Sequence, residues 1–255
     1  MKVGFIGLGN VGGKLASSLL RNKFDLTVID LDSSLTKDFL AKGASATNSP
    51  KELAQKVDII ITCLPSPKIC SEVMEKKDGV IEGLSKDKIW LEMSTTDDKE
   101  VKRIGELVKT KEAIPLDAPV SGGCHRAATG NIAIFVGGER KSFEKILPVL
   151  TIMGRQILHT GELGSASILK VITNFLASTH LAALGEGRHV IIKSTFSANS
   201  FGESAVDAPF ETKSFTKLLS KSITVKLNLF LSKLPASLPP TLPKPINPIF
   251  IFPPF

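Results

Sequence analysis

Apolar and polar positions follow two different periods along the first 160 residues. Short apolar runs predict strands at KVGFIG, DLTVID, VDIIITCLP, KIWLEMS, AIPLDAPV, NIAIFVGG and RQILHTG. Segments with helical spacing fall between them, at 10–21, 34–42, 67–76, 97–110 and 139–153. Strands in alternation with helices predict an α/β fold with a parallel, doubly wound sheet.

The stretch from Gly161 to Gly187 has the pattern of a long, mostly apolar helix in which Lys170 is the only charge between two terminal glutamates. We expect its larger apolar residues to pack inward, namely Ile168, Leu169, Ile172, Phe175 and Leu176. Small residues on the stripe of Lys170 would leave room for a ligand, namely Ala166, Ser167 and Ala177. The lysine itself has two explanations. Its stem lies on the core while its ammonium reaches water, or apolar surroundings lower its pKa for catalysis.

Composition excludes several classes of protein. The net charge is +7, but residues 188–255 hold eight Lys and Arg against three Asp and Glu, and no nucleic-acid-binding signature accompanies them. We therefore expect no nucleic-acid partner. No run of eighteen apolar residues is free of charge and proline, so we expect no membrane span. Cys63, Cys70 and Cys124 lack metal-ligand spacing, and the N-terminus does not read as a secretory signal, which indicates reduced thiols and a cytoplasmic protein.

The first motif is GLGNVG, which comprises Gly7, Leu8, Gly9, Asn10, Val11 and Gly12. It follows a predicted strand and opens a predicted helix, the context in which this pattern indicates dinucleotide binding rather than an incidental turn. Gly7 permits the tight turn, Gly9 lets the backbone approach a pyrophosphate, and Gly12 allows close packing of helix on strand. The N–H groups and positive dipole at the start of the helix would receive the phosphates.

Asp30 ends the second predicted strand, about twenty residues after the glycine motif. A carboxylate there can accept hydrogen bonds from the adenosine ribose and repels a 2′-phosphate. Asp32 strengthens this repulsion, and no arginine follows closely. The pattern favours NAD over NADP as the cofactor, although aspartate also suits an ordinary turn or cap.

The second motif is LDAPVSGG, at the carboxyl end of a predicted parallel strand, where ligands bind in such sheets. Ser121 offers a hydroxyl, and Gly122 and Gly123 offer unobstructed backbone N–H groups. Together they suit a carboxylate. The alternative is a plain turn.

GFIGLGNVG, DAPVSGG and GELGSASILKVITN, in this order and spacing, resemble the β-hydroxyacid dehydrogenases, a group that includes 3-hydroxyisobutyrate dehydrogenase and tartronate semialdehyde reductase. The resemblance covers residues 1–187. It implies a Rossmann domain joined to an all-helical domain through which the chain forms homo-oligomers, and hydride transfer between NAD and a short β-hydroxyacid or its semialdehyde.

The resemblance also implies roles for single residues. Lys170 falls on the catalytic lysine and Asn174 on a substrate-binding asparagine, while Ser121 to Gly123 fall on the carboxylate loop. Residues that line the nicotinamide side would be Leu64, Pro65 and Thr95. Because Lys170 and Asn174 are four residues apart, they share a helix face, which favours the catalytic explanation of the lysine. Thr173 stands where the related phosphogluconate enzymes carry histidine, which argues against a sugar-phosphate substrate.

The resemblance fades beyond about Gly187, where the late Lys-Asp motif of these enzymes is absent. Residues 188–255 hold nine of the fifteen prolines. We predict a Rossmann domain over 1–160, a partial helical substrate and oligomerisation domain over 161–233, and a proline-rich irregular tail over 234–255. A divergent terminus and a change of reading frame both fit this pattern. The alternative function is therefore an NAD-binding protein without turnover.

The four histidines invite a metal or catalytic-triad interpretation, and they are His125, His159, His180 and His189. Their spacing matches no zinc motif, and no serine elbow accompanies them. We interpret them as structural and expect no metal site. His125 lies closest to the proposed carboxylate loop.

Overall fold

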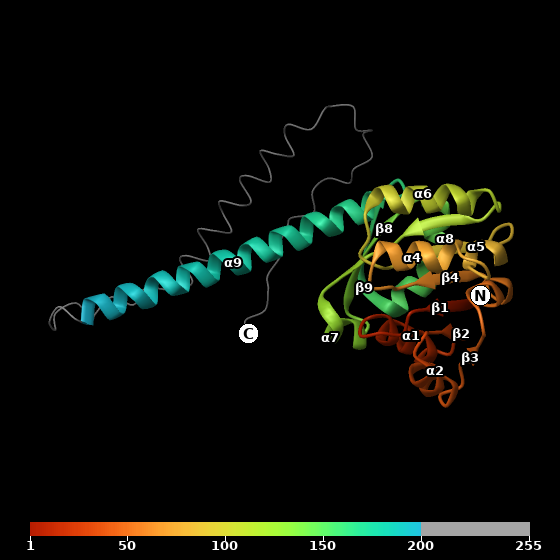
Figure 1. The fold of residues 1–255 in the computed structure, drawn as a ribbon, viewed down its shortest axis with the longest axis horizontal. Coiled ribbons are helices and arrows are strands. Elements are labelled where there is room, and N and C mark those ends of the chain that lie inside the picture. The colour runs from red at the N-terminus through yellow and green to blue at the C-terminus, as the bar shows by residue number, and fades with distance from the viewer. Residues whose placement is uncertain (200–255) are drawn as a thin grey trace, which may run out of the picture. The chain divides into compact units, whose positions relative to one another are not determined.

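The structure is a computed structural model that describes the backbone of residues 1–199 and the side chains of residues 1–186 (Figure 1). Contacts divide the chain into two units, Met1–Gly187 and Arg188–Phe255, and the first unit contains the strands of the described chain. Its strands are β1 (Lys2–Ile6), β2 (Asp25–Ile29), β3 (Ser45–Ala46), β4 (Ile59–Thr62), β5 (Ile89–Glu92), β6 (Ile114–Asp117), β7 (Val120–Ser121), β8 (Ile132–Gly137) and β9 (Gly154–Gly161). The helices are α1 (Gly12–Arg21), α2 (Ser33–Leu40), α3 (Pro50–Lys56), α4 (Pro67–Glu75), α5 (Val80–Gly83), α6 (Asp98–Lys109), α7 (Gly123–Ala128), α8 (Arg140–Met153) and α9 (Ser165–Asn199).

The strands form one sheet in the order β3-β2-β1-β4-β5-β6-β8-β7, with β9 beside β8. Strands β1 to β6 run parallel, and the order reverses between β1 and β4, which places a ligand crevice at their carboxyl ends. This arrangement confirms the predicted Rossmann-type α/β fold. The sheet is not wholly parallel, however, because β8 runs antiparallel to β6 and β7. The connection from β7 to β8 is shorter than the roughly dozen residues that a parallel crossover needs.

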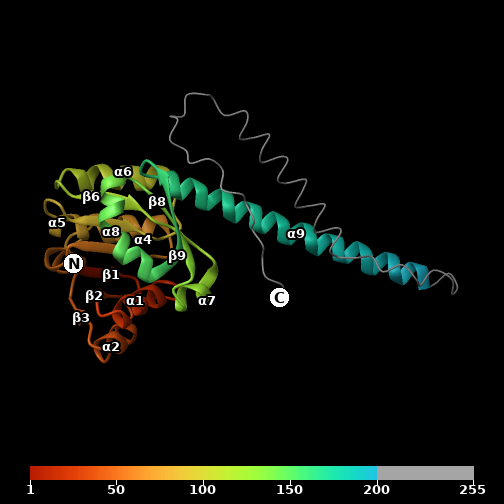
Figure 2. The same cartoon turned by 180° about the vertical axis from the view of Figure 1, so that it is seen from behind.

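Helices cover both faces of the sheet, as the opposite views in Figures 1 and 2 show. On one face α1 and α8 bury apolar side chains such as Leu15, Leu19 and Ile146 against the strands. On the other face α3 to α6 pack around Trp90, which is fully buried. The central strands are therefore apolar on both sides, as the run at 57–65 indicates for β4, whose four residues are all buried.

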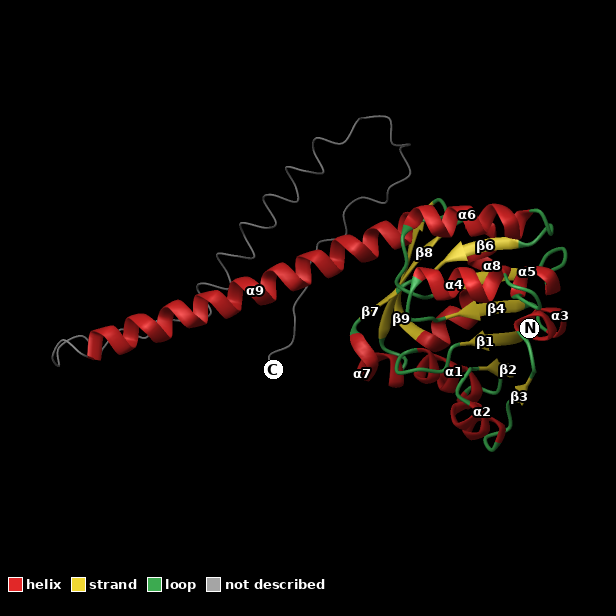
Figure 3. Ribbon diagram, in the orientation of Figure 1, coloured by secondary structure: helices red, strands yellow, loops and turns green. Residues whose placement is uncertain are grey.

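Local sequence explains where several helices begin (Figure 3). Ser49 and Ser66 each precede a proline, and their hydroxyls accept hydrogen bonds from backbone N–H groups three residues on. Asp97 caps α6 in the same way. Helix α3 was not predicted, nor were β3, α5 and α7, because each is too short to show a clear period.

Helix α9 contradicts one expectation about its apolar residues. Its first turn is buried, since Ala166 and Ser167 are 0% and 1% exposed. Beyond that turn Ile168, Ile172 and Phe175 are 45%, 43% and 67% exposed, so they do not pack inward. The small residues of the stripe also behave differently from expectation, because Ala166 and Ser167 pack against the sheet and leave no room for a ligand there. Apolar spacing indicates a face to be covered, but it does not say which partner covers it.

The predicted domain boundaries at 160 and 233 stay predictions, and the segment 234–255 lies outside the described residues. The partial helical domain predicted over 161–233 is described only in α9, as far as Asn199. Among the helices of the described chain, Ser165–Glu186 is long and apolar enough to cross a membrane by length and composition alone, with a mean hydropathy of 1.3. The expected lack of a membrane span therefore stays a prediction as well.

Candidate active site

The three motif glycines differ in what surrounds them, and their roles toward a cofactor stay predictions. Gly7 has a φ of +96°, and a Cβ there would lie 2.3 Å from the carbonyl oxygen of Cys63. A Cβ on Gly12 would lie 2.1 Å from the carbonyl oxygen of Gly7, so α1 can approach β1 only with glycine there. Around Gly9 no atom of the described chain lies within 4 Å of such a Cβ, which leaves this backbone open to a ligand.

Asp30 lies directly after β2 and holds the glycine loop in place. Its Oδ2 accepts a hydrogen bond from the N–H of Leu8 at 2.6 Å, and its Oδ1 accepts one from the N–H of Asp32 at 2.9 Å. The N–H of Gly7 donates to the carbonyl of Ile29 at 3.2 Å. Asp30 thus stands beside the loop where an adenosine ribose would lie, and its contact with the ribose stays a prediction.

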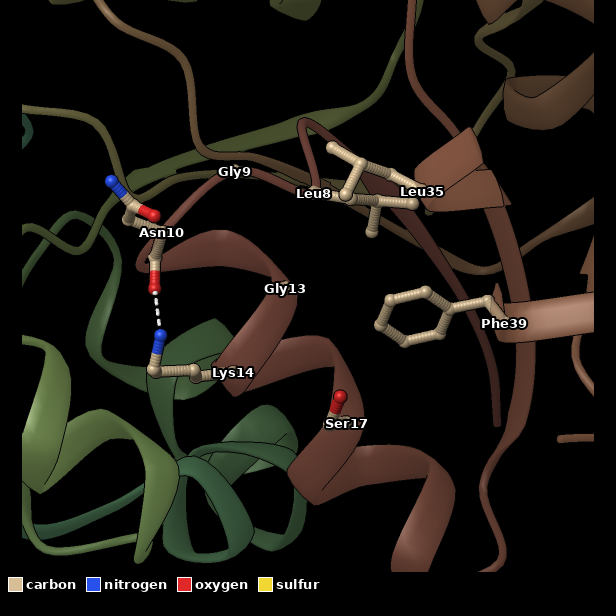
Figure 4. Close-up of a pocket in the computed structure, with 8 residues that line it drawn as sticks. All are labelled: Leu8, Gly9, Asn10, Gly13, Lys14, Ser17, Leu35 and Phe39. Carbon is tan, nitrogen blue, oxygen red and sulfur yellow. Dashed lines mark hydrogen bonds between the residues drawn. The ribbon is translucent and has the colours of Figure 1, made fainter. Parts of the chain in front are cut away.

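A hollow of about 360 Å³ opens between the glycine loop, α1 and α2 (Figure 4). Leu35 and Phe39 form its apolar wall on the side of α2, and Phe39 is 5% exposed. An apolar wall opposite the glycine loop suits an adenine base. The glycine motif does not predict this wall, because Leu35 and Phe39 lie on a different helix, α2.

The start of α1 suits an anion. Within the described chain no side chain caps this helix, and its first turn has no acidic residue. Lys14 lies in this first turn and donates from Nζ to the carbonyl oxygen of Asn10 at 2.9 Å (Figure 4). The helix dipole and this ammonium together favour a diphosphate. Lys14 was not predicted, because its partner is a backbone carbonyl oxygen, which any residue type at position 10 would supply.

The loops after β4 and β5 lie next to the glycine loop on its other side. Leu64 approaches Gly7, since its Cδ2 would be 3.1 Å from a Cβ there. The N–H of Leu64 donates to Oγ of Ser94 at 2.7 Å, which joins the two loops. Pro65 and Thr95 are exposed at this edge. The structure therefore places the three residues of the predicted nicotinamide side on two adjoining loops.

The predicted carboxylate loop is less irregular than expected. Ser121 belongs to β7 and pairs with Ala133 of β8, so it does not lie in a free loop. Gly122 and Gly123 follow with φ values of +131° and +79°, and Gly123 begins α7. Both glycines are exposed, and their positive φ values turn the backbone sharply at the end of β7. Their role toward a substrate carboxylate stays a prediction.

Asp117 joins the sheet to the start of α9. Its fully buried carboxylate accepts hydrogen bonds from the N–H of Gly164 at 2.8 Å, and from the N–H and Oγ of Ser167 at 2.8 and 2.9 Å. Gly137 makes room for it, because a Cβ there would lie 2.3 Å from Oδ1 of Asp117. Sequence reasoning placed Asp117 in the second motif but did not find this role, since its partners lie 47 and 50 residues away.

Lys170 lies one turn beyond this anchored end of α9. It is partly buried, and desolvation lowers the pKa of its ammonium from the ordinary value. Asn174 is exposed four residues further on. A lysine with a lowered pKa, held at a fixed point near the carboxyl edge of the sheet, releases its proton more readily than an ordinary lysine. The catalytic role of Lys170 stays a prediction.

Burial and backbone contacts account for three other reactive side chains, Cys63, His159 and His180. Burial, with the nearby carboxylate of Glu92, raises the pKa of the Cys63 thiol to about 12. His159 contacts the carbonyl oxygen of Gly138 at 2.9 Å, and His180 contacts that of Leu176. Among the residues searched, no three metal-ligating side chains gather. The side chain of His189 lies outside the described residues.

Three comparisons with known proteins bear on this site. The family model for the NAD binding domain of 6-phosphogluconate dehydrogenase matches residues 2–161. A probable mitochondrial 3-hydroxyisobutyrate dehydrogenase of Dictyostelium discoideum is 32% identical over 75% of this chain and 60% of its own length. The 2-(hydroxymethyl)glutarate dehydrogenase of Eubacterium barkeri is 33% identical over 73% of this chain and 62% of its own length.

Among solved structures, Mycobacterium tuberculosis 3-hydroxyisobutyrate dehydrogenase with L-serine aligns with a TM-score of 0.71 and 25% identity, over 76% of this chain and 66% of that one. The chain spans about three fifths of the length of the two dehydrogenases matched by sequence. The family match ends at residue 161, before the helix that carries Lys170 and Thr173. This chain belongs to the family of the NAD-binding domain of 6-phosphogluconate dehydrogenase, and its resemblance to the β-hydroxyacid dehydrogenases is confirmed.

Proposed function

We propose that this chain is an oxidoreductase that transfers a hydride between NAD and a short β-hydroxyacid, or the corresponding semialdehyde. The observation that carries the proposal is the anchoring of α9 by Asp117. It fixes the helix of Lys170 and Asn174 to the same sheet whose carboxyl edge forms the dinucleotide cradle. Cofactor cradle and candidate acid–base group therefore belong to one rigid framework.

The cradle fits a dinucleotide in its adenosine and diphosphate parts. Gly9 is open, the start of α1 carries Lys14, and Asp30 stands at the end of β2. Asp30 and Asp32 supply negative charge where NADP would carry its 2′-phosphate, which supports the choice of NAD. On the other side, Leu64 and Thr95 flank the position of the nicotinamide.

When bound, NAD supplies the hydride acceptor, and the chain supplies placement and proton transfer. Ser121 and the backbone N–H groups near Gly122 and Gly123 would hold the substrate carboxylate. Lys170 in its neutral form accepts the proton of the β-hydroxyl, and in the reducing direction its ammonium returns that proton to the alkoxide. Asn174, one turn along the same face, would orient the hydroxyl.

The substrate is proposed to be a small acid without phosphate. Thr173 stands next to Asn174, where a histidine would be expected for a sugar phosphate, and the relatives named above act on short acids by their names. We further propose, from the resemblance and the exposed apolar side chains of Ile172, Phe175 and Leu181, that copies of the chain associate through α9. A cytoplasmic location and the lack of nucleic-acid and membrane partners stand as proposals on the sequence alone.

The test is NADH formation by the purified full chain with NAD and a panel of β-hydroxyacids, with 6-phosphogluconate as a comparison. Activity on a short β-hydroxyacid, with none on 6-phosphogluconate, would support the proposal. Binding of NADH without turnover of any member of the panel would favour the alternative, a cofactor-binding protein without activity. Failure to bind NADH at all would refute both.

A further inference from the structure

Glu92, the last residue of β5, is a fully buried carboxylate that the reaction described above does not use. Its Oε2 accepts hydrogen bonds from Oγ1 of Thr62 at 2.6 Å and from Sγ of Cys70 at 2.7 Å. Its Oε1 accepts one from the N–H of Ser94 at 2.6 Å. Nε1 of Trp90 completes the network by donating to Oγ1 of Thr62 at 2.9 Å.

Stability alone does not account for a carboxylate in this position. Burial raises the pKa of Glu92, and it also raises the pKa of the Cys70 thiol well above its ordinary value. A buried charge carries a large desolvation penalty, and an apolar side chain of similar volume is often as stable or more so. The faces of β4 and β5 that pack on α4 are otherwise apolar, with Ile60, Met74 and Trp90 around the network.

The network reaches the crevice through Ser94. The N–H of Ser94 is held by Glu92, while its Oγ accepts the hydrogen bond from the N–H of Leu64 at 2.7 Å. Glu92 thereby fixes the loop after β5 against the loop after β4. The second of these loops lies against Gly7, so the spacing of both loops from the glycine loop depends on this chain of contacts.

We propose that Glu92 is a positioning residue for the nicotinamide half of the cofactor site. It sets the separation of the Leu64 and Thr95 loops through Ser94 and does not itself touch the cofactor. The adenosine and diphosphate half is built from the glycine loop, Asp30 and Phe39, and among the described residues none of these is hydrogen-bonded to Glu92 or Ser94. The inference rests on the proposed NAD binding, and it predicts that the two halves of the site respond differently when the network is cut.

The experiment measures binding of NADH and of ADP to the full chain by isothermal titration calorimetry. ADP probes the adenosine and diphosphate half alone. Glu92→Met keeps the size of the side chain but removes the acceptor for Ser94, and Ser94→Ala cuts the last link to Leu64 while leaving Glu92 in place. Because each variant removes a hydrogen bond from the loop framework, we expect NADH affinity to fall roughly tenfold in both, with ADP affinity close to the parent's.

Glu92→Gln is the conservative variant. Its amide oxygen can still accept from the N–H of Ser94 while its NH₂ group donates to Thr62, so NADH affinity should return close to that of the parent. The control is Lys88→Met at the opposite, amino end of β5, where Nζ donates to the carbonyl groups of Gln55 and Val57 at 2.9 and 2.7 Å. This variant should lower the melting temperature without changing either affinity.

Equal losses of NADH and ADP affinity in Glu92→Met and Ser94→Ala would overturn the inference, since they would indicate a general structural defect. Unchanged NADH affinity in both variants would overturn it as well. If Glu92→Met does not fold, Ser94→Ala decides the question by the same criterion. A parent chain that binds no NADH would instead refute the proposed function, so the two failures are distinguishable.

Discussion

Asp117→Asn should weaken the attachment of α9 to the sheet. Both oxygens of Asp117 are occupied, Oδ1 by the N–H of Gly164 and Oδ2 by the N–H and hydroxyl of Ser167. Whichever way the amide of asparagine lies, its NH₂ group faces one of these backbone N–H groups. One hydrogen bond to a buried charge is lost and one buried donor is left unpaired, so we expect a loss of about 2–4 kcal/mol.

The assay is urea unfolding of the full chain, together with hydrogen exchange of single amides. With a slope of about 1–3 kcal/mol per molar urea, the midpoint should fall by roughly 1–2 M. The amides of Gly164 and Ser167 should exchange faster than in the parent. Gly137→Ala should reproduce both effects, because its Cβ would lie 2.3 Å from Oδ1 of Asp117 and 2.7 Å from the carbonyl oxygen of Glu162.

Asp98→Asn is the matched control for the same change of group. Asp98 pairs with Lys102 at 2.9 Å, but its side chain is 31% exposed, so water screens the pair and the midpoint should barely move. An Asp117→Asn variant with the midpoint and the amide exchange of Asp98→Asn would refute the reasoning that Asp117 anchors α9.

Three further results are expected. Fluorescence titration should show NADH binding more tightly than NADPH, because Asp30 and Asp32 repel a 2′-phosphate. Equal affinities would contradict the choice of NAD as the cofactor. Gly123→Val should raise the KM for a β-hydroxyacid while NADH affinity stays near the parent's. The reason is that valine is strained at a φ of +79° and obstructs the backbone N–H groups. An unchanged KM would show that the substrate binds elsewhere. The rate of NADH formation should rise as the pH passes through the lowered pKa of Lys170, because the base must be neutral. The rate of the reverse reaction should fall over the same range. Rates that do not change with pH in either direction would contradict a lysine base.

The sequence predicted the longer strands and the glycine loop correctly, because the pattern that indicates each of them lies within a few consecutive residues. Long apolar runs identified β1, β2, β4, β5, β6 and β8, and the glycine pattern placed the cradle at the start of α1. The short elements escaped because two to seven residues hold too little of a period. For α3 a cap-like signal was present in Ser49, Pro50 and Glu52, and it could have been used.

The candidate site was less predictable where contacts cross long distances in the sequence. The partners of Asp117 and Glu92 lie up to 50 and 30 residues away, and no spacing rule connects them. The apolar positions of α9 show a second reason why the prediction failed, this time for a pattern that is local. Their spacing predicts a covered face, yet Ile172 and Phe175 are exposed in the described structure, because burial depends on a partner that periodicity does not name.

The central claim is that Lys170 carries the proton in an NAD-dependent oxidation. The most direct measurement is the kcat of NADH formation by Lys170→Ala on the β-hydroxyacid that the parent turns over, with NADH affinity measured in parallel. Lys109→Ala, at an exposed lysine of α6, serves as the control. We predict that Lys170→Ala lowers kcat by about 10²–10⁴-fold, the usual effect of losing a general acid–base group, while NADH affinity is kept. Turnover within a few fold of the Lys109→Ala control would contradict the account and leave Lys170 as a surface lysine whose stem lies on the helix.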